Sequence, residues 1–227
     1  MNSHSIATEI VAEQRTENWY AARLGRATAS KFYDIIAGTK NGYAATRKNY
    51  RAELVIERLT GQSIDTFQNA AMSWGNDTED LARTTYMLET GNVADTCGFY
   101  AHNEIMAGAS PDGLIGDDGT IEIKSPNPAT HIETLRLGSI PTKYVPQVQG
   151  QLWMTGRKWC DFISFDPRLP QNAQLFIQRI ERDNKYIAYL ETEVIKFLVE
   201  VDEEVKFVQE YHAPIITSKL REEPAHV

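Results

Sequence analysis

Helix signals mark six stretches of the chain. They are apolar residues three or four positions apart, or a capping residue before the stretch and a glycine after it. Asp183 stands at a capping position before the last stretch, whose apolar residues form a stripe opposite many acids. The predicted helices cover residues 13–24, 31–36, 45–59, 69–88, 146–155 and 183–210.

Strand signals lie between these helices. Residues 93–107, 159–165 and 174–180 are rich in β-branched and aromatic residues. Between the first two of these stretches, residues 108–126 form a predicted β-hairpin, in which the sequence Gly-Asp-Asp-Gly at 116–119 is the turn. Helices and strands therefore mix along the chain, which predicts an α/β fold.

The hairpin brings chemically active side chains together. Asp112 stands where its first strand begins or bends, and residues 120–124 alternate polar and apolar side chains. A period of two places Glu122 and Lys124 on one face, while Ile121 and Ile123 face the other side. An acid and an amine are thus held side by side on a strand that is anchored in a core.

Two carboxylates with an adjacent lysine suit phosphodiester hydrolysis. Asp112 and Glu122 offer oxygen ligands to Mg²⁺, which activates water, and Lys124 removes the proton of that water or stabilises developing charge. The spacing matches the PD-(D/E)XK nuclease signature, in which Pro111 precedes the first acid. The alternative from this motif alone is a solvated hairpin with an exposed Glu–Lys pair, worth about 0–1 kcal/mol.

Other candidates each have an ordinary alternative. Glu79 is placed to point at the metal site, or to form a surface pair with Arg83 four residues later. Gln147 and Gln151 share a helix face, where they contact a metal-bound water or a phosphate, or are solvated. Tyr144, just before that helix, is a core aromatic or stacks near DNA.

An anion site is predicted near the start of the second helix. Thr28 or Ser30 is placed as its N-cap, and free N–H groups there attract phosphate, although capping alone explains these residues. Arg23 is permanently charged and binds phosphate oxygens in a fork, unless it only serves the end of the first helix. Ser110 stands two residues before Asp112. These observations predict that Arg23, Ser30 and Ser110 bind a terminal 5′-phosphate beside the metals.

Composition sets the class of protein. The chain has 227 residues, of which 42% are hydrophobic, and this suits one domain over residues 1–227 with a flexible tail at about 213–227. We expect a cytoplasmic protein with no membrane span and with two reduced cysteines, Cys97 and Cys160. The five histidines show no ligand spacing for zinc. The net charge of −8 argues against a protein coated with a DNA-binding surface, and it can be reconciled with DNA binding if basic residues line a local groove or an enclosed channel.

Seven separated blocks of sequence decide among these alternatives. They span roughly residues 15 to 200, and the chain resembles the phage lambda exonuclease (YqaJ-like viral recombinase) family in all of them, in order. The blocks are Trp19…Ala22-Arg23-Leu24-Gly25…Thr28-Ala29-Ser30, Trp74-Gly75…Glu79…Ala82-Arg83-Thr84, Ser110-Pro111-Asp112-Gly113-Leu114, Glu122-Ile123-Lys124-Ser125-Pro126, Arg136-Leu137-Gly138, Tyr144-Val145-Pro146-Gln147-Val148-Gln149, and Phe165-Asp166-Pro167-Arg168.

The resemblance implies a PD-(D/E)XK nuclease fold, a central mixed sheet with helices on both faces. It implies a Mg²⁺-dependent exonuclease that degrades the 5′-ended strand of double-stranded DNA and leaves a 3′ single strand for recombination. Asp112, Glu122 and the carbonyl of Ile123 would bind two Mg²⁺ ions, with Mn²⁺ as a substitute. Lys124 would act on the attacking water, and Glu79 and Gln147 would orient water or metal.

The resemblance also implies partners. They are double-stranded DNA ends, two further copies of the chain in a ring-shaped homotrimer, and a single-strand annealing protein. The setting would be the cytoplasm of a bacterial host, with a phage or prophage as the source. Two alternatives remain, a structure- or sequence-specific endonuclease with the same triad, and a non-catalytic DNA-end-binding protein that keeps the fold as a scaffold. The intact triad speaks against the second.

Overall fold

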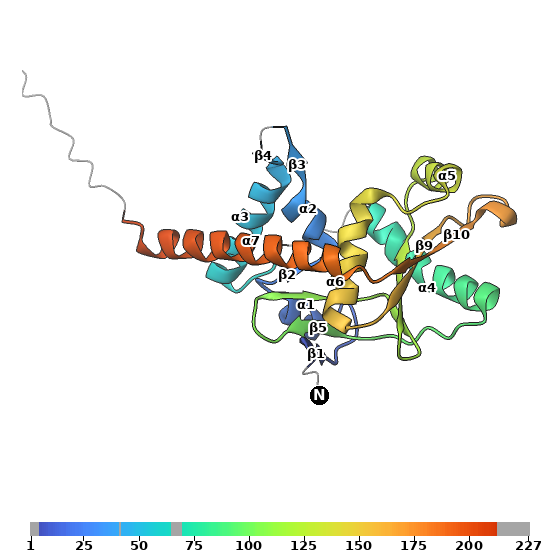
Figure 1. The fold of residues 1–227 in the computed structure, drawn as a ribbon, viewed down its shortest axis with the longest axis horizontal. Helices are drawn as coiled ribbons and strands as arrows, with labels where there is room; N and C mark the ends of the chain where they lie inside the picture. The colour runs from blue at the N-terminus through green and yellow to red at the C-terminus, as the bar shows by residue number, and fades with distance from the viewer. Residues whose placement is uncertain (1–4, 41, 65–69, 213–227) are drawn as a thin grey trace, which may run out of the picture.

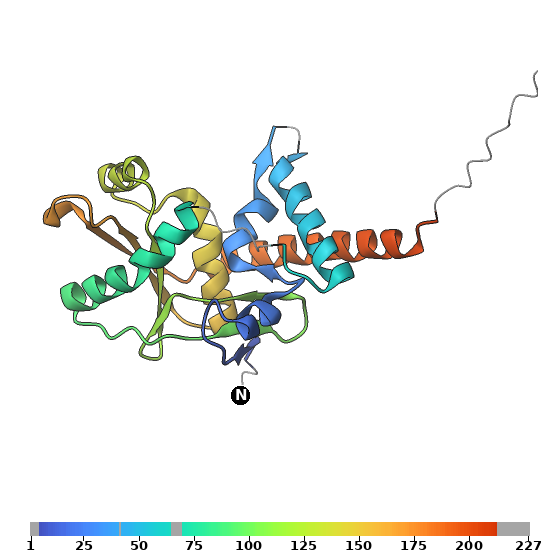
Figure 2. The same cartoon turned by 180° about the vertical axis from the view of Figure 1, so that it is seen from behind.

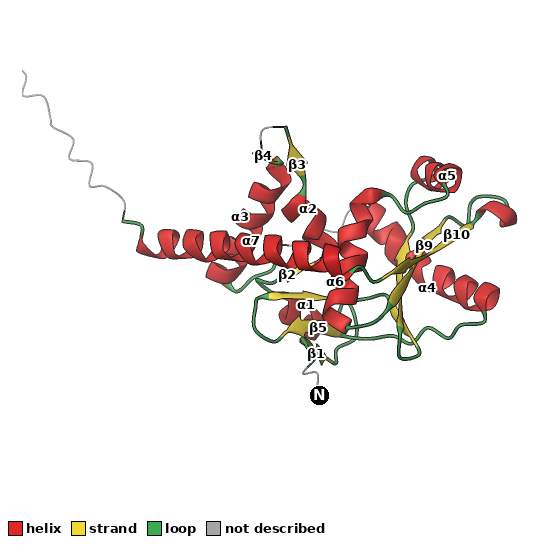
Figure 3. Cartoon of the chain, in the orientation of Figure 1, coloured by secondary structure: helices red, strands yellow, loops and turns green. Residues whose placement is uncertain are grey.

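The structure is a computed structural model that describes residues 5–40, 42–64 and 70–212 (Figure 1). Helices α3 and α7 lie on one side of the molecule, and α4 and α5 lie with strands β9 and β10 on the other (Figure 3). The helices are α1 Glu17–Arg23, α2 Phe32–Ile36, α3 Ala45–Thr60, α4 Ala70–Thr90, α5 Pro128–Leu137, α6 Val145–Thr155 and α7 Asn184–Glu210, with 3₁₀ turns at η1 Ala29–Lys31, η2 Thr142–Tyr144 and η3 Gln171–Ala173.

Within the described residues the strands form two four-stranded sheets, ordered β1-β5-β6-β2 and β10-β9-β8-β7, and the pair β3-β4. Each four-stranded sheet is mixed, because β2 runs parallel to β6 and β8 parallel to β9 while the other neighbours are antiparallel. The predicted α/β class with mixed strands between helices is confirmed. The strands are β1 Ala7–Ile10, β2 Ala27–Thr28, β3 Gly38–Thr39, β4 Gly42–Tyr43, β5 Phe99–His102, β6 Ala107–Ala109, β7 Gly113–Ile115, β8 Gly119–Lys124, β9 Trp159–Phe165 and β10 Leu175–Glu181.

The predicted hairpin is β7 and β8. Gly116 turns the chain with φ +49°, a value that a residue with a Cβ rarely adopts. Gly119 begins β8 under the ring of Trp159, where an added Cβ would collide with the ring. The hairpin is therefore fixed both by its turn and by close packing against the neighbouring strand β9.

Alternation along β8 divides its side chains between two helices. Ile121 and Ile123 pack in a cluster with Ala82 and Tyr86 of α4. Glu122 lies on the opposite face, where it bonds to side chains of α6. Figure 2 shows α4 crossing in front of this sheet. The sheet thus has a helix on each face, and its polar row meets α6.

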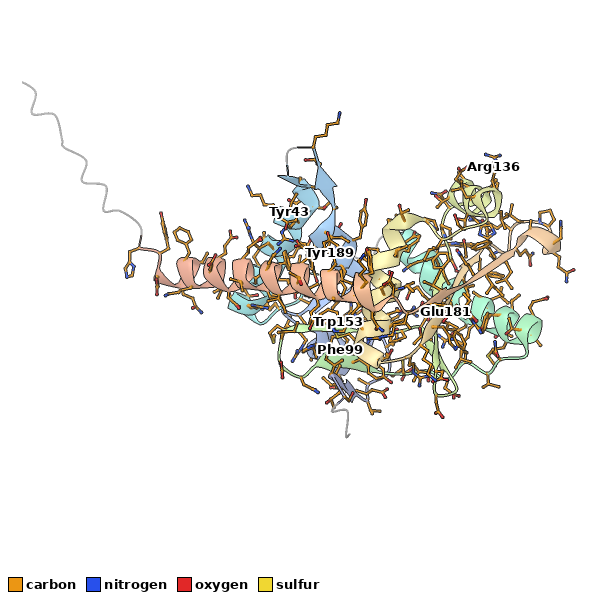
Figure 4. The ribbon with its side chains drawn as sticks, viewed as in Figure 1. Tyr43, Phe99, Arg136, Trp153, Glu181 and Tyr189 are labelled. Carbon is orange, nitrogen blue, oxygen red and sulfur yellow. The ribbon has the colours of Figure 1, made fainter. Side chains whose placement is uncertain are left out.

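The larger core lies around α6. Trp153 of α6 packs against Phe32 of α2 at 6.1 Å and His102 of β5 at 5.6 Å between ring centroids (Figure 4). The apolar stripe of α7 closes this core, and Asp183 caps that helix through the N–H groups of Lys185 and Tyr186. The predicted helices at 45–59, 146–155 and 183–210 are confirmed, and α6 is held rigidly beside the polar face of β8.

Several predicted boundaries are wrong. The first helix does not begin at residue 13, because Arg15 adopts φ 70° and Thr16 is the N-cap. The strand expected at 93–107 is divided into β5 and β6, since His102 Nδ1 accepts the N–H groups that follow it. No predicted element corresponds to the short pair β3 and β4, to the helix α5 or to the strand β1. The tail at 213–227 lies outside the described residues.

Candidate active site

Asp112 and Glu122 are brought together by the hairpin. Asp112 stands directly before β7, and its backbone N–H bonds to the carbonyl of Ile121 at 3.1 Å. Its Oδ2 accepts the N–H of Ile123 at 2.6 Å. The first acid is therefore tied by backbone and side chain to the strand that carries the second.

Glu122 is buried, with 1% of its surface exposed, and both oxygens of its carboxylate accept hydrogen bonds. Oε1 receives Lys124 Nζ at 2.6 Å and Gln147 Nε2 at 2.5 Å, while Gln151 Nε2 donates to Oε2. Both glutamines come from the face of α6 that the four-residue spacing predicts. Buried charges need such partners, and these hold the carboxylate in one orientation.

The charges in this cluster act on one another. Burial raises the pKa of Asp112 well above its usual range, and the carboxylates of Glu122 and Glu79 raise it further. Burial alone would lower the pKa of Lys124, but Glu122 and Asp112 outweigh it, so the net shift is upward and the ammonium is favoured. Crowded carboxylates of this kind favour binding of a proton or a cation.

Glu79 lies at the edge of the cluster between two arginines. Its Oε1 accepts Arg83 Nη2 at 3.0 Å, and its Oε2 accepts Arg15. Arg83 also donates to the backbone carbonyl of Asp112. The pair four residues apart does form, but its side chains are only 14% and 15% exposed, and Arg83 connects α4 to the first acid.

Arg23 and Ser110 are joined through Trp19. The guanidinium of Arg23 lies 4.0 Å from the Trp19 ring centroid. The indole Nε1 of Trp19 donates to Ser110 Oγ at 2.9 Å. One aromatic side chain of α1 therefore positions two of the three residues predicted to bind a terminal phosphate.

The predicted N-cap at Thr28 or Ser30 is wrong. Neither hydroxyl makes a capping hydrogen bond, because the chain enters α2 through the 3₁₀ turn η1 and the two Oγ atoms lie 3.3 Å apart. Ser30 lies inside η1 and is exposed. The predicted anion site therefore has the hydroxyls of Thr28 and Ser30 close together, but no long helix begins there.

All the predicted site residues line one groove of about 430 Å³. Ile123 reaches it although its side chain packs toward α4, which leaves the backbone on the groove side. Tyr144 also lines the groove, and its ring is 5.3 Å from Lys124 Nζ and stacked on Phe162. The predicted site residues in the groove are Arg23, Ser30, Glu79, Ser110, Asp112, Glu122, Ile123, Lys124 and Gln147.

Gln151, which the sequence places on the helix face of Gln147, donates to the Glu122 carboxylate. Other residues at the site were not predicted. Trp19 belongs to a family-like block but carries no local sign of its contact with Ser110. Gln14, which donates to the carbonyl of Pro111 at 2.8 Å, and Arg15 carry no sequence signal for the site.

Comparison with known proteins identifies the family. The model of the YqaJ-like viral recombinase domain matches residues 18–158, more than half of the chain. The chain belongs to this family. Its structure is similar to that of the alkaline exonuclease LHK-Exo of Laribacter hongkongensis, with a TM-score of 0.79 and 49% sequence identity. The match covers 86% of this chain and 96% of LHK-Exo. LHK-Exo in complex with dAMP matches with a TM-score of 0.80 and the same identity and coverage.

Two further similarities agree with this assignment. A phage-related exonuclease of Haemophilus somnus 129PT shares the fold at a TM-score of 0.65 and 18% identity, over 81% of this chain and 96% of that one. The protein ExoD of Escherichia coli K12 is 34% identical over 79 residues, which are 32% of this chain and 90% of ExoD. The family and the two matches to LHK-Exo make this chain a nuclease.

No helix in the described part of the chain has both the length and the apolar composition needed to cross a membrane.

Proposed function

We propose that the chain is a Mg²⁺-dependent exonuclease that degrades double-stranded DNA from 5′ ends and leaves 3′ single strands. The observation that carries this proposal is the single groove that holds Asp112, Glu122 and Lys124 together with Arg23, Ser30 and Ser110. The residues proposed to hydrolyse DNA and those proposed to bind the terminal phosphate therefore line the same groove. The complex of the relative LHK-Exo with dAMP supports a nucleotide as the product class.

The donor set fits Mg²⁺. Among the described residues, no three His, Cys, Asp or Glu side chains lie close enough to hold an ion. Mg²⁺ is commonly bound by one or two carboxylates, with waters and substrate phosphates in the other positions. Asp112, Glu122 and the backbone carbonyl of Ile123 would hold up to two ions, with Mn²⁺ as a substitute. Bound there, the metal activates water and neutralises charge on the scissile phosphate.

The surrounding side chains act on the water and the phosphate. Lys124 is a donor in this structure, so its ammonium would hold the attacking oxygen and stabilise the charge that develops. Gln147 and Gln151 fix the Glu122 carboxylate, and Glu79 acts through Arg83 on the position of Asp112. Water adds to phosphorus, and the bond to the 3′-oxygen of the terminal nucleotide breaks.

Hydrolysis at that bond is compatible with digestion from the 5′ end. The shortened strand keeps the phosphorus as a new 5′-phosphate, which is the group that Arg23, Ser30 and Ser110 are arranged to bind. Capture of each new phosphate would advance the strand by one nucleotide and set the next bond against the metals. Recognition of the end and repetition of the cut would then depend on the same pocket.

The proposed partners are DNA ends, two further copies of the chain and a single-strand annealing protein. The net charge of −8 is compatible with DNA binding when basic residues line an enclosed channel, which supports the ring-shaped homotrimer. A mass near three times 25.7 kDa in light scattering is expected, and a monomer at micromolar concentration with DNA bound would exclude the ring. A single-strand annealing protein would receive the 3′ strand in the cytoplasm of a bacterial host that carries the phage gene.

One assay distinguishes the proposal from its rivals. A linear duplex labelled on one strand is incubated with Mg²⁺ or with a chelator, beside the same sequence as a covalently closed circle. We expect loss of nucleotides from the 5′ end of the linear duplex, only with Mg²⁺, and an intact circle. Cleavage of the circle would indicate an endonuclease, and binding without digestion would indicate an end-binding protein.

A further inference from the structure

Arg15 has an unusual backbone for its residue type. Its φ is 70°, and among the described residues it alone, apart from glycines, has positive φ. Side chains with a Cβ rarely adopt this region, and such outliers cluster at functional sites. The turn is held on both sides, since Gln14 bonds to Pro111 beside the hairpin and Thr16 Oγ1 bonds to the carbonyl of Glu13 at 2.7 Å.

The ion pair that Arg15 makes is not needed to neutralise its partner. Glu79 is also bound by Arg83, whose second nitrogen donates to the carbonyl of Asp112. The side chain of Arg83 is 14% exposed and that of Arg15 is 39% exposed. If Arg15 moved away, Glu79 would keep its buried arginine, so the movement would leave no isolated carboxylate.

Arg15 stands where a substrate would pass. It lines the catalytic groove and also a second hollow of about 480 Å³, and Glu79 and Asp112 border both. Arg23 also lines the groove, and with Ser30 it borders another hollow. Two guanidinium groups therefore line the groove that holds Asp112 and Glu122.

We propose that Arg15 is a second phosphate-binding residue, which exchanges Glu79 for a backbone phosphate of DNA next to the scissile bond. This inference rests on the proposed function. A guanidinium binds phosphate oxygens in the same forked geometry as carboxylate oxygens. Arg15 can therefore exchange one anionic partner, Glu79, for another, the phosphate. The strained turn holds the charge at the groove, and Arg83 keeps Glu79 in place.

The test is the salt dependence of DNA binding. A fluorescent, 5′-phosphorylated duplex is titrated with wild type, Arg15→Gln and Arg15→Lys in Ca²⁺, with gels to verify that the duplex stays intact. Each phosphate contact contributes about 0.7–0.9 to the slope of log K against log salt. We expect Arg15→Gln to reduce the slope by about that amount and Arg15→Lys to preserve it.

Arg15→Gly separates the effect of the lost charge from the effect of backbone strain, because glycine adopts φ 70° without strain and also lacks the charge. Its salt slope should match that of Arg15→Gln. Lys158→Ala is the control, since Lys158 is an exposed cation paired with Asp118 beyond the other end of β8. An unchanged slope in Arg15→Gln, even with slower digestion, would overturn the proposal and leave Arg15 as a positioning residue for Glu79. A wild type that neither binds nor digests the duplex would refute the proposed function itself.

Discussion

The indole of Trp19 donates to Ser110 Oγ at 2.9 Å while its ring lies beneath the guanidinium of Arg23. One side chain thereby positions both a charged and a neutral donor of the proposed 5′-phosphate pocket. We therefore expect recognition of the 5′ end of the DNA to depend on α1 as much as on the hairpin.

Graded variants test this pocket. Arg23→Ala should remove the preference for 5′-phosphate over 5′-hydroxyl ends, because the forked donor is lost. Trp19→Phe keeps a ring under Arg23 but loses the bond to Ser110, worth about 0.5–1.5 kcal/mol, so the preference should fall about 2- to 10-fold. Initial rates on duplexes that differ only in the terminal group measure both. Equal wild-type rates on the two ends would refute the pocket.

The support of Glu122 by α6 is tested with Gln151→Met, which keeps the length of the side chain and removes the donor. Loss of a residue that orients a metal ligand typically costs about 10- to 100-fold in affinity or activity. We expect a higher Mg²⁺ concentration for half-maximal rate. Gln149→Met is the matched control, because Gln149 bonds to the backbone of Glu181 and Asp183 instead. A similar Mg²⁺ shift in both variants would contradict a specific role for Gln151.

The raised pKa of Asp112 predicts a pH effect on stability. Without metal, burial raises the pKa of Asp112, so the folded state holds this proton more tightly than the unfolded chain, in which the pKa of an aspartate is about 3.9. The free energy of unfolding should therefore fall as pH rises above about that value and through the higher folded pKa. Asp112→Asn should remove this component, and Mg²⁺ should oppose it in wild type. Urea unfolding at several pH values in chelator gives the comparison, and identical slopes for the two proteins would contradict it.

Packing at the start of β8 predicts a loss of stability in Gly119→Ala. The added Cβ would collide with Trp159, and overpacking of this kind costs about 1–3 kcal/mol. The hairpin would shift and slow digestion as well. Gly38→Ala is the control, because its Cβ would lie 3.8 Å from Gly42 O, an ordinary contact. Equal unfolding midpoints for the two variants would show that β8 tolerates the displacement.

Local patterns predicted the parts of the site that depend on local geometry. Alternation along β8 placed Glu122 beside Lys124, and the helical spacing placed Gln147 with Gln151. Residues 64 and 91 positions apart form the pairs Arg15–Glu79 and Trp19–Ser110, which no local period encodes. Periodicity does not indicate that Arg23, Ser30 and Ser110 belong together, but all three lie in the sequence blocks that resemble the family.

The same contrast explains the wrong boundaries. The helix signal before residue 17 is overridden by the left-handed turn at Arg15, which depends on contacts with the hairpin and α4. The cap predicted at Ser30 is absent because a 3₁₀ turn precedes α2. Both differences lie at the groove, where tertiary contacts override local preference.

Hydrolysis of DNA by Asp112, Glu122 and Lys124 is tested with the variant Lys124→Ala. The measurement is the initial rate of digestion of a 5′-phosphorylated linear duplex in Mg²⁺, with binding of the same duplex measured in Ca²⁺. Lys158→Ala serves as the matched loss of a lysine. We expect the rate for Lys124→Ala to be lower by about 10²–10³, with binding retained, and the rate for Lys158→Ala to stay near that of wild type. Digestion by Lys124→Ala at the wild-type rate would contradict it.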